Sequence, residues 1–245
     1  MTKAYDQTAC WVGASSKIKG TNCYKPGGTA TLAMGACNGR IADKGTDPWG
    51  MGRWSYVLLE GKGTLSKLLT ITGYQTGYRT GQIGHQAAWT QRIAVLFKDN
   101  REENPSDAFY KDLAEWIHKY RTADMELILC FDANERWSEK STIYTFAEGL
   151  NRINVNQEFM LEATHPHMAN LSKSTTIDYC LCIEQLSASV EYAASVPYDL
   201  ESLGDHRGFV FIRIDRQGSL WDLLQSRKKL PASVGRPSGL VTEFD

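Results

Sequence analysis

The chain has 245 residues, 42% of them hydrophobic, which is enough for one large domain with its own core. Seven tryptophans and eleven tyrosines argue against extensive disorder, and a formal net charge of −1 gives no overall positive field of the kind that marks many nucleic-acid-binding proteins. No apolar run approaches the roughly 20 residues that span a bilayer, and no signal-peptide core is visible, so no membrane partner is expected.

The chain is expected to divide into three segments. Residues 1–25 are polar and are expected to form a leader or a partial strand. A Pro-Gly-Gly turn then opens the main domain, over 26–215. Residues 216–245 are expected to form a short helix followed by a flexible tail.

Alternating or clustered apolar residues between turn residues predict strands along the chain. In chain order they span 29–36, 53–60, 67–74, 127–131, 175–183 and 206–214. The Gly-Lys-Gly turn at 61–63 predicts an antiparallel hairpin between the second and third of these strands. A strand at 189–195 is expected to pair with the strand at 175–183, and residues 43–52 are expected to form a loop.

Helices are predicted over 85–98, 105–120 and 141–152. The second has the clearest pattern, with apolar residues at helical spacing, Pro105 in the first turn and Asn104 or Ser106 as the cap. Antiparallel runs of strands with a few long helices, and no regular β-α-β alternation, favour an α+β fold. The expected architecture is a sandwich of two mostly antiparallel β-sheets flanked by helices.

Six cysteines fit no Cys-x-x-Cys pair and no zinc-ligand spacing. Cys130, Cys180 and Cys182 lie in apolar strand-like runs, where a free thiol behaves as a small hydrophobic side chain. The chain is therefore interpreted as soluble and intracellular, in the cytoplasm or the nucleus, without a disulfide framework. A secreted form with disulfides is the alternative.

The central prediction concerns the strand at 127–131, which is apolar throughout and is followed by Asp132 and Asn134. Alternation along an extended chain places these two side chains on the same face. A carboxylate beside a carboxamide suits a divalent ion and a phosphate oxygen, because one carries charge and the other donates a hydrogen bond. The alternative is an ordinary turn after a strand.

Three other polar positions also stand at predicted strand ends: Tyr74, Asp178 and the pair Asp205-His206. Each has a structural alternative, since a strand-end tyrosine often packs, a lone acid among apolar residues is often a hydrogen-bonded core group, and Asp-His also suits a turn.

Taken together and in this order, the four segments resemble the endonuclease/exonuclease/phosphatase superfamily, which includes DNase I and the apurinic and retrotransposon endonucleases. Ile71-Thr72-Gly73-Tyr74 is similar to that family's Val-x-x-Tyr, and Phe131-Asp132-Ala133-Asn134 to its Gly-Asp-x-Asn. Thr176-Ile177-Asp178-Tyr179 is similar to Arg-Ile-Asp-Tyr, and Gly204-Asp205-His206 to Ser-Asp-His. The resemblance covers residues 20–214 and implies the four-layer DNase I-like form of the sandwich.

The resemblance implies a DNA endonuclease, as part of a mobile element, that uses Mg²⁺ or Mn²⁺. Asp132 would orient or deprotonate the attacking water and, with Asp205, hold the ion. Asn134, His206 and Tyr74 would contact the phosphate, and Asp178 would hold the imidazole in the required tautomer. Four loop residues are candidates for contacting DNA, with packing as loop anchors the alternative for the tryptophans: Arg53, Trp54, Arg79 and Trp137.

One family feature has no counterpart in the sequence. The family's principal metal ligand is a Glu that precedes the Gly-Gly strand, and the first glutamate of this chain is Glu60. The fold is therefore expected to be N-terminally incomplete. Three explanations are open: a complementing polypeptide supplies the missing strand and Glu, Asp6 or another acid replaces it, or the chain is a catalytically impaired member that only binds nucleic acid or protein. A phosphatase for a small molecule or lipid headgroup is a further alternative.

Overall fold

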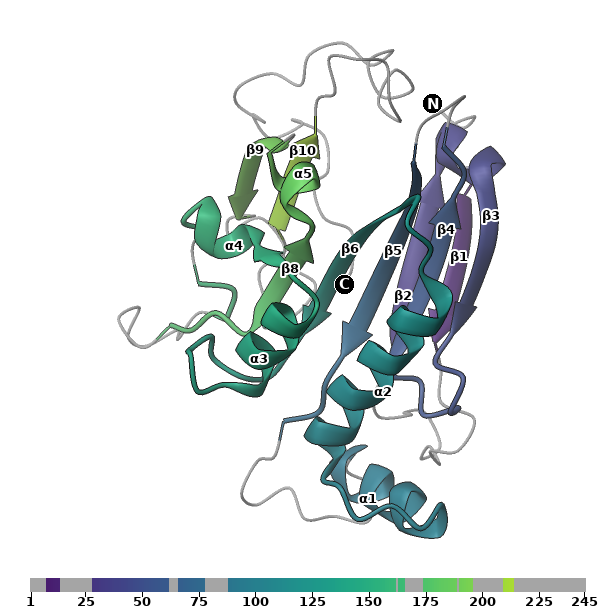
Figure 1. Ribbon diagram of the computed structural model, residues 1–245, viewed down its shortest axis with the longest axis vertical. Coiled ribbons are helices and arrows are strands. Elements are labelled where there is room, and N and C mark those ends of the chain that lie inside the picture. Colours follow the sequence, from purple (N-terminus) through teal and green to yellow (C-terminus); the bar gives the residue numbers. More distant parts are fainter. Residues whose placement is uncertain are drawn as a thin grey trace, which may run out of the picture.

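A six-stranded sheet in the order β3-β4-β5-β6-β8-β7 forms the centre of the fold (Figure 1). The computed structural model describes residues 8–13, 28–61, 66–77, 88–161, 163–165, 174–188, 190–195 and 209–213. The strands of the sheet are β3 (Ile41–Thr46), β4 (Trp54–Leu59), β5 (Lys67–Tyr74), β6 (Met125–Asp132), β7 (Ile153–Asn154) and β8 (Asp178–Cys182). Four of its five strand pairings are antiparallel, and only β5 and β6 run parallel.

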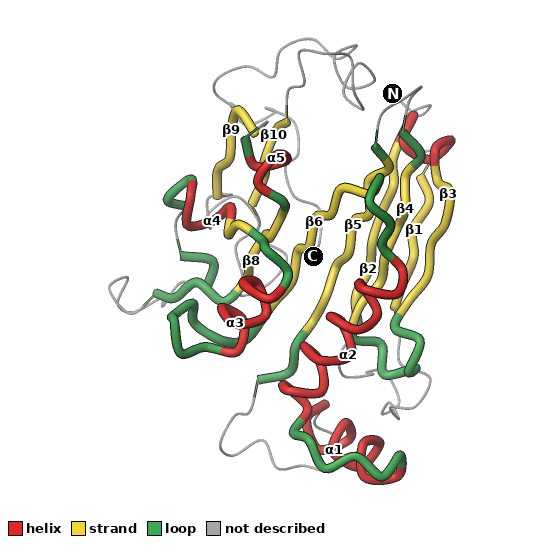
Figure 2. The backbone as a smooth tube through the Cα atoms, viewed as in Figure 1, coloured by secondary structure: helices red, strands yellow, loops and turns green. Residues whose placement is uncertain are grey.

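In the described part of the chain, two two-stranded antiparallel sheets and six helical segments accompany this sheet (Figure 2). The two-stranded sheets are β1 (Thr8–Gly13) with β2 (Thr29–Met34), and β9 (Val190–Ser195) with β10 (Phe209–Arg213). The longer helices are α1 (Ala88–Lys98), α2 (Pro105–Tyr120) and α3 (Thr142–Gly149). The short segments are the 3-10 turn η2 (Gly35–Arg40), α4 (Val155–Glu158) and α5 (Glu184–Ser187). The predicted mixed architecture of antiparallel strands flanked by helices is confirmed.

The local sequence signals placed several elements within a few residues. β5 has the predicted bounds 67–74, and its antiparallel pairing with β4 is confirmed. The helix α2 begins at Pro105, because the side chain of Asn104 accepts hydrogen bonds from the backbone N–H groups of Ser106 and Asp107 at 2.9 and 3.0 Å. The capping residue thus decides where this helix starts.

The parallel pair β5–β6 departs from the expected run of antiparallel strands. Parallel neighbours require a crossover that returns the chain to the same end of the sheet, and α1 and α2 provide it. The sequence shows both helices but not that the strands on either side of them are neighbours. This crossover places the C-terminal ends of β5 and β6 side by side at one end of the sheet.

Two strand predictions were wrong. Residues 41–46, partly assigned to a loop, form the edge strand β3, where Gly45 lies against the ring of Tyr56 so closely that an added Cβ would be 2.8 Å from a ring carbon. The glycine and charged residues of this segment are typical of a loop, but they are also common in a strand at the edge of a sheet. The strand β9 pairs with β10 and not with β8, because both edges of β8 are taken by β6 and β7.

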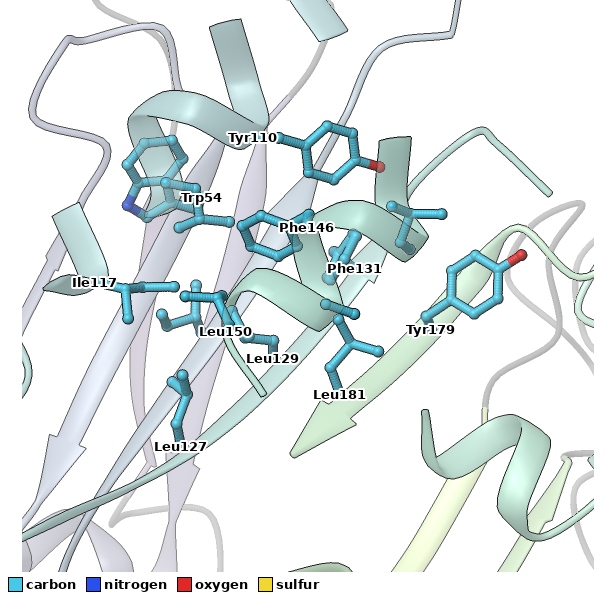
Figure 3. Close-up of a cluster of buried hydrophobic side chains, with 14 of the residues drawn as sticks. Trp54, Tyr110, Ile117, Leu127, Leu129, Phe131, Phe146, Leu150, Tyr179 and Leu181 are labelled. Atoms are coloured by element: carbon cyan, nitrogen blue, oxygen red, sulfur yellow. The ribbon is translucent and has the colours of Figure 1, made fainter. Parts of the chain in front are cut away.

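The alternation of β6 separates the two faces of the sheet. Leu127, Leu129 and Phe131 point to the face covered by α2 and α3, where they pack with aromatic side chains from both helices (Figure 3). Ile128, Cys130 and Asp132 point to the opposite face. On that face β2 contacts the sheet through Thr31, whose hydroxyl lies 2.9 Å from the hydroxyl of Ser55 and 3.1 Å from that of Thr72.

A buried ion network joins the loop before β4 to helix α2. The Arg53 guanidinium donates from Nε to Asp47 at 2.7 Å and from Nη1 to Asp112 at 2.7 Å, and Arg101 also donates to Asp112 at 2.9 Å. Arg53 is 1% exposed, and both carboxylates are buried. Each buried charge has an opposite charge in contact, so the loss of Asp47 leaves the buried Arg53 with a single carboxylate, Asp112, which it shares with Arg101.

We therefore expect Asp47→Asn to lower the free energy of unfolding by about 3–5 kcal/mol, measured by urea denaturation. The matched control is Glu60→Gln, which removes an exposed ion pair with Lys67 at 3.7 Å and should cost less than about 1 kcal/mol. Equal effects of the two substitutions would contradict the role assigned to the buried network.

Candidate functional site

Three polar side chains form a row across adjacent strands of the sheet. Tyr74, the last residue of β5, is the register partner of Asp132, the last residue of β6. Asp132 is in turn the register partner of Asp178, the first residue of β8. Register partners in neighbouring strands point to the same face, so all three half-buried side chains lie on the face opposite α2 and α3.

The two carboxylates of this row make its electrostatics unusual. Asp132 and Asp178 stand directly opposite each other on antiparallel strands, where side chains approach closely and like charges repel. A cation at this position removes that repulsion. Carboxylate oxygens are ligands that a divalent cation prefers, and the phenol of Tyr74 flanks the two carboxylates on the β5 side.

Asn134 ties the turn after β6 to the end of β5. Its backbone adopts the left-handed conformation, with φ 49°, and its N–H donates to Oδ1 of Asp132 at 2.9 Å. Its side-chain Nδ2 donates to the carbonyl of Gln75 at 2.8 Å. The backbone N–H of Asn134 thus orients the Asp132 carboxylate. The side-chain amide has two hydrogens, and the hydrogen bond to Gln75 uses one of them.

The loop that follows is held by the hydroxyl of Tyr179. This hydroxyl donates towards the carbonyls of Thr176 at 2.6 Å and Glu135 at 3.1 Å and accepts from the Trp137 N–H at 2.8 Å. Burial is the main cause that raises the pKa of Tyr179 to about 12, so its hydroxyl stays a donor at neutral pH. The carboxylate of Glu135 accepts from the N–H groups of Thr142 and Ile143 at the start of α3.

The structure brings four of the predicted site residues together: Tyr74, Asp132, Asn134 and Asp178. Three others, Asp205, His206 and Arg79, lie outside the described residues, so their predicted roles stay predictions. Trp137 is half-buried, with its ring centroid 5.5 Å from that of Tyr179, and lines a surface cavity of about 670 Å³ beside α3.

The assignment of Arg53 and Trp54 to substrate binding was wrong. Trp54 is 0% exposed and packs in the core against Phe109 and Trp116. Arg53 is enclosed by its two carboxylate partners, Asp47 and Asp112. Both residues have a structural role, in line with the packing alternative considered for Trp54.

Sequence reasoning missed Arg92 of α1, which lies against the site end of β5. Its Nη1 donates to the carbonyl of Tyr74 at 3.3 Å and to the hydroxyl of Thr76 at 3.2 Å, and its guanidinium carbon is 5.6 Å from the centroid of the Tyr74 ring. The buried side of this helix is not purely apolar, because it carries Arg92 beside Leu96.

Solved structures share this fold at low sequence identity. They include an AP endonuclease, LMAP, from Leishmania major (12% identity, TM-score 0.58, covering 86% of this chain and 72% of that chain). The endonuclease domain of TRAS1, a telomere-specific non-LTR retrotransposon, matches at 12% identity and TM-score 0.52, over 86% and 82% of the two chains. A 3' phosphatase, NExo, from Neisseria, solved with a product DNA hairpin, matches at 12% and 0.51, over 86% and 80%.

These likenesses define the fold as DNase I-like, which is the fold that the motif resemblance implied. No protein-family model and no curated protein matches the sequence. Nothing in the fold or in these comparisons supports a separate polypeptide that completes the chain. None of the helices in the described ranges has the length and apolar composition of a membrane span.

The contact between Gly77 and Asn134 gives a stability test of the site. A Cβ at Gly77 would lie 2.9 Å from the Cβ of Asn134, so we expect Gly77→Ala to displace the turn and to cost about 1–3 kcal/mol in urea unfolding. The control is Gly149→Ala, where an added Cβ meets nothing within 4 Å and the change should be neutral or stabilising. A Gly77→Ala protein as stable as the control would refute this packing.

Proposed function

We propose that the chain is a divalent-metal-dependent phosphodiester hydrolase that cleaves DNA as an endonuclease. The observation that carries the proposal is the row Tyr74–Asp132–Asp178 at one end of the sheet, with Asn134 beside it. Support comes from the similar structures, whose names describe two endonucleases and a 3' phosphatase bound to a product DNA hairpin. The retrotransposon endonuclease among them supports an origin in a mobile element.

The residues present fit a hard divalent ion such as Mg²⁺ or Mn²⁺. Mg²⁺ is commonly held by one or two carboxylates, with water and substrate phosphate completing its shell. Asp132 and Asp178 supply two facing carboxylates, and Asp205 is proposed as a further ligand. Within the described ranges no group of three or more His, Cys, Asp or Glu side chains is placed to hold a metal, so the proposed site relies on Asp205 or on the substrate.

In the proposed reaction, a water attacks the phosphorus while Asp132 takes its proton, the bond from phosphorus to one sugar oxygen breaks, and that oxygen leaves as a hydroxyl after gaining a proton from solvent. The bound ion would supply Lewis-acid stabilisation of the charge that develops on the phosphate. Asp132 holds and orients the attacking water, with its carboxylate fixed by the Asn134 N–H. Asn134 and Tyr74 donate to phosphate oxygens, and His206, held by Asp178, is proposed to donate as well.

The proposed DNA-binding surface lies around the loops that leave this end of the sheet. Trp137 lies in the loop after β6, on the α3 side of the sheet, with its ring against Tyr179, and its indole face is proposed to stack on a sugar or base. Arg79 follows β5 by five positions in the sequence and is proposed to contact a backbone phosphate.

One structural feature favours a second candidate function. Among the described residues no third His, Cys, Asp or Glu joins Asp132 and Asp178, and a metal site with few ligands binds weakly, since changes around the ligands alone cost roughly 10- to 100-fold. A catalytically impaired protein that binds nucleic acid or a protein partner is therefore the alternative. It predicts DNA binding without metal-stimulated turnover. A phosphatase for a small molecule or lipid headgroup is a third candidate, because that chemistry uses the same groups.

The test is nicking of supercoiled plasmid DNA with Mg²⁺ or Mn²⁺, followed on agarose gels. We expect chelation by EDTA to stop nicking, and Asp132→Ala and His206→Ala each to reduce the rate by at least about 100-fold. The control Asp124→Asn changes an exposed carboxylate beyond the other end of β6 and should nick at the wild-type rate.

Each other outcome selects a different function. Nicking that persists in Asp132→Ala and His206→Ala rules out this site. Plasmid binding without nicking at any Mg²⁺ or Mn²⁺ concentration supports the binding module. Release of phosphate from inositol phosphates, with plasmid left intact, supports the phosphatase.

A further inference from the structure

Arg92 carries a buried positive charge at the end of β5, under the proposed phosphate site. Its side chain is 1% exposed. One nitrogen, Nη1, holds the carbonyl of Tyr74 and the hydroxyl of Thr76, while Nε and Nη2 have no hydrogen-bond partner among the described residues. A guanidinium that is removed from water and only partly hydrogen-bonded among the described residues is costly, and such a group calls for an explanation, of which a bound ion or a functional role is one.

Unlike Arg53, Arg92 has no carboxylate in ion-pair contact among the described residues, and Asp47 acts on its charge only from farther away. Arg53 has carboxylates at 2.7 Å on two sides, whereas no Asp or Glu of the described ranges forms an ion pair with Arg92. The chain between β5 and the end of α1 also cannot provide one, because residues 75–98 contain no Asp or Glu. Burial, followed by the charge of Arg53, lowers the pKa of Arg92 to about 10, so it stays protonated at neutral pH.

The contacts of Arg92 point to the same end of the sheet as the candidate site. Tyr74, whose carbonyl it holds and whose ring it lies against, is the register partner of Asp132. Thr76 lies between Gln75 and Gly77. The carbonyl of Gln75 accepts a hydrogen bond from the side chain of Asn134, and Gly77 lies close to that side chain. Arg92 therefore holds the segment that in turn places both Tyr74 and Asn134.

We propose that Arg92 is a positioning residue for phosphate binding: it fixes the Tyr74–Thr76 strand end and gives it the positive charge that draws a phosphate to Tyr74 and Asn134. The inference rests on the proposed function for the identity of the ligand, a phosphate group. The negative charges of Asp132 and Asp178 disfavour an anion at this end of the sheet. The buried guanidinium of Arg92 offsets them on the β5 side. The charge acts at short range through protein and is screened less than a surface charge.

The experiment compares three variants of the full chain by isothermal titration with inorganic phosphate, without metal and at low salt. Arg92→Gln keeps a donor for the Tyr74 carbonyl but removes the charge, and Arg92→Lys keeps the charge. The matched control is Arg121→Gln, since Arg121 also donates to a backbone carbonyl, that of Met125 at 3.0 Å, but at the opposite end of β6.

We expect Arg92→Gln to weaken phosphate binding by about 10- to 100-fold, the range for one charged interaction. Arg92→Lys should recover most of that loss, and Arg121→Gln should bind as the wild type does. In nicking assays Arg92→Gln should raise KM for plasmid, whereas a purely structural defect lowers the active fraction and hence kcat while leaving KM unchanged.

Two results would overturn the inference: equal phosphate affinity of Arg92→Gln and wild type, or an equal loss in Arg92→Gln and Arg92→Lys. A wild type that binds no phosphate also overturns it. Because phosphate binding is measured without turnover, Arg92-dependent binding in a protein that never nicks DNA defeats the proposed function alone. Asp132-dependent nicking with unaltered KM in Arg92→Gln defeats this inference alone.

Discussion

The register between β5, β6 and β8 is the constraint on which the site depends. It aligns Tyr74, Asp132 and Asp178 in one row, although these residues lie far apart in the chain. A shift of one residue in either pairing would turn a carboxylate of the row to the face covered by α2 and α3, among Phe131 and Leu129. The apolar packing of that face therefore fixes the alignment of the three polar side chains on the opposite face, because it makes any other register costly.

Two buried arginines near this end of β5 differ in whether a carboxylate pairs with them. Near α2, the Arg53 guanidinium is enclosed by Asp47 and Asp112 and serves only to hold loop and helix together. Beside it, Arg92 is equally buried and lacks a carboxylate among the described residues, and Asp132 faces Asp178 across the pairing. On the proposed function, a metal-bound phosphate fits this arrangement, in which Tyr74 separates the buried guanidinium from the two facing carboxylates.

The sequence revealed the parts of this site that depend on local pattern. Asp132 and Asn134 follow an apolar run, and Tyr74 and Asp178 stand at the ends of readable strands, so motif order was enough to group them. The buried roles of Arg53 and Trp54 were not visible, because the partner Asp112 is 59 residues from Arg53 in the chain. Arg92 was missed for the same reason, because its partners Tyr74 and Thr76 are 18 and 16 residues away in the chain. The edge strand β3 was missed because its residues are typical of loops.

The central claim is that the three-strand row is one cation-and-phosphate pocket. Its most direct test is a crystal structure with Mn²⁺, in which anomalous scattering locates the ion. The account predicts a peak on the order of 2 Å from a carboxylate oxygen of Asp132, on the face away from α2 and α3. Mn²⁺ bound elsewhere, with the Asp132 carboxylate contacting no ion at saturating Mn²⁺, would contradict it.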